Sequence, residues 1–151
     1  MGDILDLHVR KRYAGFNLSV SASVPSGIVA IFGPSGSGKT SLLNCISGLV
    51  SPDEGEISLH GQILFSSSQD LNLPPERRRI GYMFQESLLF PHLKVRENIL
   101  YGYNLTSPSI RRIDPSQLVN LLELEPLMDR RPENISVGER QRVVLARALA
   151  T

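Results

Sequence analysis

The stretch IVAIFGPSGSGKT (28–40) decides the fold of this chain. Its first five residues are apolar and mostly β-branched, which is typical of a short strand buried on both faces of a sheet. The remaining eight match the pattern G-x-x-x-x-G-K-[ST]. The segment that follows, SLLNCISGL (41–49), has apolar residues at helical spacing and meets Gly48, a suitable C-terminal cap. A strand, a glycine loop and a helix in this order predict an α/β fold that binds a ligand at the end of the strand.

The glycine loop has the chemistry of a triphosphate cradle. Gly36 and Gly38 lack the Cβ atoms that would hold phosphates away from the backbone, so successive N–H groups can turn inward. The following helix adds its positive N-terminal dipole. Lys39 supplies a full charge for the β- and γ-phosphates, and the Thr40 hydroxyl is placed for Mg²⁺. The residues predicted to bind the nucleotide are Gly33, Pro34, Ser35, Gly36, Ser37, Gly38, Lys39, Thr40 and Ser41.

Composition limits the class of protein. The chain of 151 residues is long enough for one domain with a core, and its formal net charge is +1. This balance argues against a nucleic-acid partner and against a polybasic membrane anchor. Cys45 is the one cysteine, so no internal disulfide can form, which fits a reducing compartment. No apolar run approaches the roughly 20 residues that span a bilayer.

The part of the chain before the helical region reads mainly as strands. Segments 4–9 and 17–24 alternate apolar and polar residues, as half-buried strands do. Segment 56–66 reads as two short strands joined at His60-Gly61, and IGYMF (80–84) reads as a second strand buried on both faces. We expect a β-rich part over about 1–66.

From Glu86 onward the pattern becomes helical, with an expected helical insert over about 87–135. One helix should open at Asp114, with Pro115 at its first position. The last helix should open with a capping box formed by Ser136 and Glu139.

Two later segments carry a resemblance to a known family. MFQESLLFPHLKVRENILYG (83–102) after the glycine loop, followed by ISVGERQRVVLARAL (135–149), resembles the ATP-binding subunit of ABC transporters. The resemblance covers essentially the whole chain. Within the family, segment 71–102 is most similar to the molybdate importer ATPase. The ATPases of iron, sulfate, polyamine and sugar importers have a less similar version of this segment. The resemblance implies one nucleotide-binding domain over 1–151 with a P-loop nucleoside-triphosphate hydrolase fold: a mostly parallel core sheet, an N-terminal antiparallel β subdomain and a helical insert.

The resemblance also implies roles for individual residues. Gln85 would contact Mg²⁺ and the attacking water, and a neutral amide suits both contacts. Tyr13 is the candidate for stacking on the adenine of ATP, with Phe16 as its rival. The apolar segment LLFPHL (88–93) would form part of the groove for a helix of the transmembrane permease. Its alternative role is as the small core of the helical insert.

The start of the last helix would serve a second copy of the subunit. In the family, two ATPase subunits face each other head to tail, and this helix meets the nucleotide of its partner. The residues implied in trans are Ser136, Val137, Gly138 and Glu139. Val137 departs from the family, which has glycine there. Binding in trans should weaken if its side chain faces the nucleotide and should be tolerated if it faces outward.

The family continues beyond LARALAT (145–151) with a buried strand that ends in Asp-Glu, the Walker B acid and the catalytic base. We therefore expect an N-terminal fragment, incomplete at its C-terminus, that binds ATP and Mg²⁺ without hydrolysing ATP. Without that strand, segment 28–32 and the last helix should have apolar faces that lack a partner.

The expected function is to bind and hydrolyse MgATP to drive uptake of a solute, most consistently molybdate. The subunit would lie peripherally at the cytoplasmic face of the inner membrane. Its partners would be permease subunits, a second ATPase subunit and, indirectly, a periplasmic or extracellular solute-binding protein. The alternatives are a non-catalytic nucleotide-binding or regulatory fragment, and the ATPase of a related iron, sulfate, polyamine or sugar importer.

Overall fold

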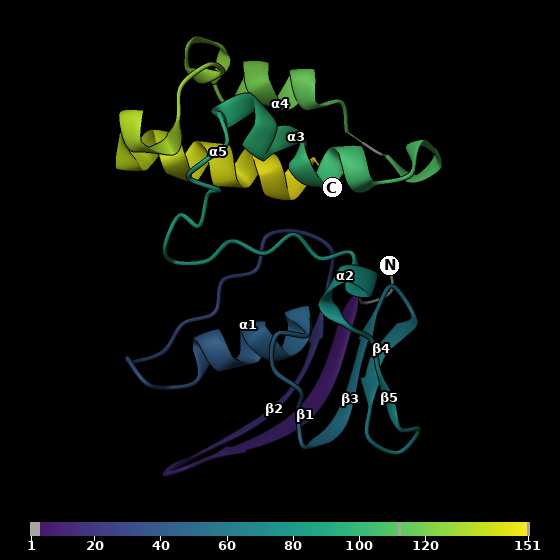
Figure 1. Ribbon diagram of the computed structural model, residues 1–151. Helices are drawn as coiled ribbons and strands as arrows, with labels where there is room; N and C mark the ends of the chain where they lie inside the picture. Colours follow the sequence, from purple (N-terminus) through teal and green to yellow (C-terminus); the bar gives the residue numbers. More distant parts are fainter. Residues whose placement is uncertain (1–3, 112, 151) are drawn as a thin grey trace. The chain divides into compact units, whose positions relative to one another are not determined.

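The computed structural model of the chain describes residues 4–111 and 113–150 (Figure 1). These residues form two compact units, one that ends at Ile80 and one that begins at Gly81. None of the helices in the described part of the chain is long and apolar enough to cross a membrane.

The first unit is built on a five-stranded sheet in which every neighbouring pair is antiparallel. Alternation along the strands directs Leu7 and Val9 to one face and their polar neighbours to the other. The antiparallel β subdomain predicted from sequence is therefore present. In the order β2-β1-β3-β4-β5, its strands are β1 (Leu5–Tyr13), β2 (Phe16–Val24), β3 (Glu54–Leu59), β4 (Gln62–Ser66) and β5 (Leu71–Asn72).

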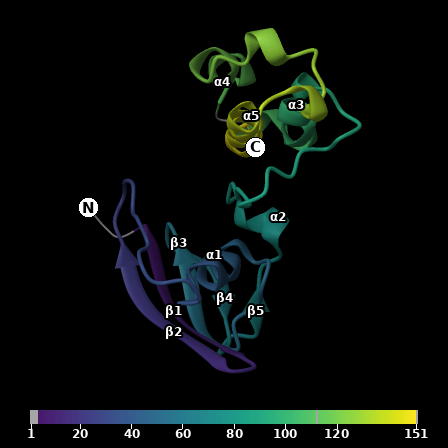
Figure 2. The same cartoon turned by 90° about the vertical axis from the view of Figure 1, so that its left-hand side faces the viewer.

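Helix α1 (Lys39–Ser47) covers the apolar face of this sheet (Figures 1 and 2). Leu42 and Cys45 on the helix share one buried cluster with Val9 and Ile57 on the strands. The helix ends where predicted, at Gly48, whose φ of 85° suits a glycine C-cap. One short helix, α2 (Pro75–Arg78), closes the unit.

Two predicted strands differ from the structure. Segments 28–32 and 80–84 are irregular and pair with no strand among the described residues. Ile28 is fully exposed and Phe32 is 92% exposed. The physical reason is that a parallel strand is stabilised by the strands beside it, and an apolar run alone does not specify one.

The second unit is helical. It contains α3 (Val95–Leu105), α4 (Pro115–Leu121) and α5 (Val137–Leu149), with short 3₁₀ turns at Pro108–Ile110, Glu125–Leu127 and Pro132–Asn134. The buried core of this unit joins these helices through Ile99, Leu118 and Val143. Helix α5 therefore packs against both α3 and α4.

Local caps fix where these helices begin. Asp114 accepts a hydrogen bond from Ser116 N at 2.9 Å at the start of α4, with Pro115 at the first helical position as predicted. At the start of α5, Ser136 and Glu139 form the predicted capping box, with Ser136 N to Glu139 Oε2 at 2.6 Å and Glu139 N to Ser136 Oγ at 3.3 Å.

Candidate nucleotide-binding site

The glycine loop forms a tight turn directly before α1. Gly36 and Gly38 adopt φ of 80° and 92°, a region that residues other than glycine disfavour. Ser37 N donates to Pro34 O at 3.2 Å within the turn, and Leu42 N donates to Gly38 O at 2.8 Å in the first turn of the helix. The chain thus turns sharply and enters the helix without an intervening spacer.

The N-terminus of α1 presents groups that could bind an anion. Its cap, Gly38, provides no side chain to accept from the first-turn amides. Lys39 Nζ donates to Gly33 O and Pro34 O, at 2.8 Å each, which holds the ammonium group over the loop. Thr40, the next residue of the helix, is exposed. Amide donors, one positive charge and one hydroxyl therefore meet at the same place.

A hollow of about 240 Å³ lies beside this loop. Phe16 forms its apolar wall, and Tyr13 stacks on Phe16 without lining the hollow, with ring centroids 6.2 Å apart and planes inclined by 25°. Phe16 rather than Tyr13 is thus the aromatic residue that borders the hollow. The residues that line it are Phe16, Ser35, Gly36, Gly38, Lys39, Thr40 and Ser41, none of which is a carboxylate.

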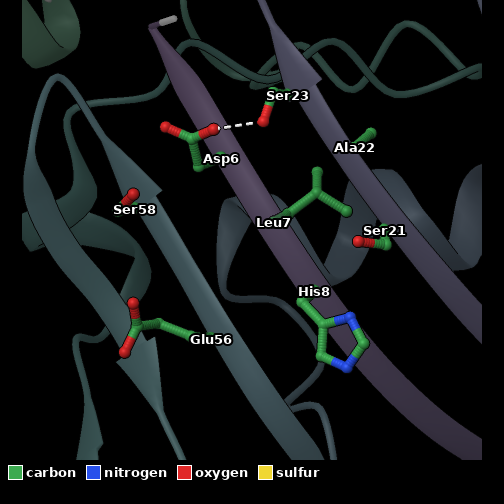
Figure 3. A pocket seen from close by; sticks show the side chains of 8 residues that line it. All are labelled: Asp6, Leu7, His8, Ser21, Ala22, Ser23, Glu56 and Ser58. Atoms are coloured by element: carbon green, nitrogen blue, oxygen red, sulfur yellow. Dashed lines mark hydrogen bonds between the residues drawn. The ribbon is translucent and has the colours of Figure 1, made fainter.

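A larger hollow, of about 440 Å³, lies on the sheet (Figure 3). Its polar side chains alternate with the apolar ones that face α1. Asp6 and Glu56 give it negative charge, and Asp6 accepts a hydrogen bond from Ser23 Oγ at 2.5 Å. Carboxylates repel phosphate, so the smaller hollow is the better candidate for a nucleotide. The lining residues of the larger one are Asp6, Leu7, His8, Ser21, Ala22, Ser23, Glu56 and Ser58.

The remaining predicted site residues belong to the second unit. Gln85 is exposed on a bend of the chain. In segment 88–93, Leu88 is exposed, whereas Leu89 packs against the helical core. Leu89 therefore belongs to the core of the helical unit, as the alternative role expects, and Leu88 remains accessible.

Segment 88–93 has a fixed shape because of one buried amide. Asn98 on α3 is 0% exposed. Its Nδ2 donates to the carbonyl oxygens of Phe90, Leu93 and Lys94 at 3.1–3.2 Å, and its Oδ1 accepts from Phe90 N at 2.8 Å. At the other side, Arg147 of α5 donates to Leu88 O at 2.6 Å. The backbone around the exposed Leu88 is thus held by α3 and α5.

The first turn of α5 exposes the side chain of Val137, at 61%. The capping box holds the Glu139 carboxylate against Ser136 N, and these hydrogen bonds lower the pKa of Glu139. The valine side chain takes no part in that capping box. It leaves the cap of the helix intact.

Sequence reasoning missed two residues of structural importance. Asn98 lies inside an amphipathic helix, and Arg78 is one of three consecutive arginines. Arg78 is nevertheless 2% exposed, whereas Arg77 and Arg79 are exposed. A polar residue at a position that helical periodicity assigns to the core was the available signal for Asn98. No local pattern distinguishes Arg78 from its neighbours.

Comparison with known proteins agrees with this geometry. A family model described as ABC transporter matches residues 17–151. The chain is 49% identical over 146 residues to the molybdenum import ATP-binding protein ModC of Paramagnetospirillum magneticum, covering 97% of this chain and 40% of that protein. The corresponding protein of Vibrio cholerae is 51% identical over 144 residues, with 95% and 38% covered. The chain thus spans about 40% of the length of these curated relatives.

A solved structure is also similar. It is an ATP-binding cassette in a dimeric post-hydrolysis state with ADP and Pi, 28% identical, with a TM-score of 0.70. The match covers 97% of this chain and 69% of that chain. This likeness confirms the predicted ATP-binding-cassette fold, in truncated form and with its antiparallel β subdomain. The mostly parallel core sheet of that prediction is not formed among the described residues, where every strand pair is antiparallel.

Proposed function

Because the chain belongs to the ABC transporter family, we propose that it is the nucleotide-binding part of an importer ATPase and binds MgATP at the glycine loop. The observation that carries the proposal is the junction at Gly38. There, the N-terminus of α1, the Lys39 ammonium group and the hollow beside Phe16 meet. A triphosphate would accept hydrogen bonds from the loop amides and from Lys39, and an adenine would pack against Phe16.

The residues present fit Mg²⁺ as the partner ion of the nucleotide. Mg²⁺ prefers oxygen ligands and is commonly held by one or two protein groups together with substrate phosphates and water. The exposed Thr40 hydroxyl at the first turn of α1 is such a group. Gln85 is our second proposed ligand, through its side-chain oxygen.

We further propose that this chain alone binds ATP and does not turn it over appreciably. Bound Mg²⁺ would neutralise phosphate charge, and hydrolysis would still need a group that orients the attacking water. None of the residues that line the hollow in the described part of the chain is a carboxylate. Gln85 can position a water but is no general base.

The solute that we propose is molybdate, supported by relatives whose printed names are molybdenum import proteins. The partners would be permease subunits that dock on segment 88–93, and a solute-binding protein that acts through the permease. This arrangement would place the subunit peripherally at the cytoplasmic face of the inner membrane. The exposed Leu88, in a segment whose backbone is held by Asn98, supports a docking role.

A second copy of the chain is our proposed partner at α5. The similar cassette is described as dimeric, which supports a head-to-tail pair in which Ser136 to Glu139 meet the nucleotide of the other subunit. The intact capping box supports tolerance of the valine by the start of the helix.

Equilibrium binding and phosphate release test the proposal together. Isothermal titration with MgATP should show one site per chain. Lys39→Ala should weaken the affinity for MgATP by about tenfold or more, because a charge-assisted contact is worth about 1.5–3 kcal/mol. Ser67→Ala is the control, because Ser67 does not line the hollow and its hydroxyl hydrogen-bonds to the backbone of Gly55. Absence of binding by the unaltered chain would contradict the site, and robust phosphate release would contradict the proposed lack of turnover.

A further inference from the structure

Arg78 is a buried cation that the nucleotide site as described does not use. Its Nε donates to Leu73 O at 2.8 Å, and its Nη2 donates to Asn72 Oδ1 at 2.7 Å. Its Nη1 donates to Cys45 O at 2.8 Å and to Ile46 O at 2.9 Å. All four acceptors are neutral oxygens, so the guanidinium is held by its fork of donors rather than by an ion pair.

Two of those acceptors lie in the last turn of α1. The final carbonyls of a helix lack partners within the helix and carry the negative end of its dipole. The Arg78 guanidinium satisfies the carbonyls of Cys45 and Ile46 and complements that dipole. It also ties them to Asn72 and Leu73, at the end of the sheet.

The end of α1 is shaped to admit this side chain. Gly48, the C-cap of the helix, has a φ of 85°. A Cβ at this position would lie 2.6 Å from Arg78 Nε. The glycine therefore allows both the turn of the backbone and the close approach of the guanidinium.

The opposite end of the same helix carries the phosphate loop. Nine residues of α-helix form a rod about 13 Å long. We propose that Arg78 is a positioning residue for the phosphate loop: by fixing the C-terminal end of α1, it sets where the first-turn amides and Lys39 stand. The proposal rests on the proposed function, since it concerns the affinity of that loop for phosphates. Groups that hold a binding group in place through a second contact are commonly needed for its affinity.

Matched variants separate positioning from simple stabilisation. Arg78→Met removes charge and donors, Arg78→Lys keeps the charge but not the fork, and Arg77→Met changes an exposed neighbour. Dissociation constants for MgATP and for magnesium tripolyphosphate would be measured by titration calorimetry, where circular dichroism shows each variant folded. Urea midpoints without ligand would be recorded in parallel.

We expect Arg78→Met to weaken both ligands about tenfold or more, Arg78→Lys to weaken them less, and Arg77→Met to stay within about twofold of the unaltered chain. A residue that only stabilises the fold would lower the urea midpoint and leave both dissociation constants unchanged in folded variants. That result overturns the proposal. If Arg78→Met does not fold, the same comparison on Arg78→Lys decides. Absence of MgATP binding by the unaltered chain would instead overturn the proposed function.

Discussion

Phe16 lies so close to Gly38 that a Cβ on the glycine would stand 2.7 Å from Phe16 Cζ. The same ring borders the hollow beside the phosphate loop, and Tyr13 stacks on it without lining the hollow. The aromatic ring and the start of α1 are thus in direct contact. This contact makes Phe16 our first choice for the residue that meets the base of a bound nucleotide.

Replacing Phe16 with leucine should therefore weaken MgATP but not magnesium tripolyphosphate. Stacking of a base on an aromatic ring is worth about 1–3 kcal/mol, which corresponds to about 5- to 150-fold in affinity. Leucine keeps most of the apolar volume against Gly38, so the loop should retain its shape. Titration calorimetry with both ligands gives the measurement. Tyr13→Leu is the matched control, and a larger loss from it would reverse the assignment.

Changing Val137 to glycine should alter association between copies rather than binding by one copy. The side chain is exposed and takes no part in the capping box, so MgATP affinity of the monomer should change less than twofold. Glycine within a helix costs up to about 1 kcal/mol, and less in the first turn. Sedimentation with and without MgATP would detect self-association, with Val137→Ala as the control. A tenfold change in monomer affinity would show that the residue acts on its own site.

Removing the Asn98 amide should destabilise the second unit. In Asn98→Leu, the Phe90 N–H and the Leu93 carbonyl lose their partner, whereas the Phe90 and Lys94 carbonyls keep their backbone hydrogen bonds. Buried polar groups left unpaired cost about 1–3 kcal/mol each, and partial access of water should limit the total to about 2–4 kcal/mol. Urea unfolding measures the loss. Asn104→Leu, exposed on the same helix, should change stability by less than about 0.5 kcal/mol.

The stability of the first unit should fall in alkaline solution because of Cys45. Burial raises the pKa of this thiol, so the folded chain keeps its proton at a pH where the unfolded chain releases it. The favourable contribution is fully present below the unfolded thiol pKa of about 8.5 and is lost as pH rises above it. Urea midpoints between pH 7 and pH 10 give the slope. Cys45→Ala should be less stable at pH 7, but its stability should fall less as the pH rises. If the stability of both chains falls with the same slope, other groups cause the loss.

Features set by neighbouring residues were predictable from the sequence. The alternation in β1 and β2, the turn at His60-Gly61 and the caps at Asp114 and Ser136 all depend on residues a few positions apart. The phosphate loop and its helix followed from the same kind of local pattern.

Features set by distant residues were not predictable. The strands expected at 28–32 and 80–84 depend on strands beside them, which a run of apolar residues does not supply. The contact between Arg78 and Cys45 joins positions 33 apart in the chain. The sequence alone does not distinguish the three consecutive arginines, because only the fold places Arg78 at the end of α1.

The boundary between Ile80 and Gly81 also has a consequence for biosynthesis. Domains commonly fold as units while the ribosome is still adding residues. The glycine loop, α1, Gly48 and Arg78 all precede that boundary, so the phosphate cradle and its anchor can assemble on the nascent chain before α5 has been translated.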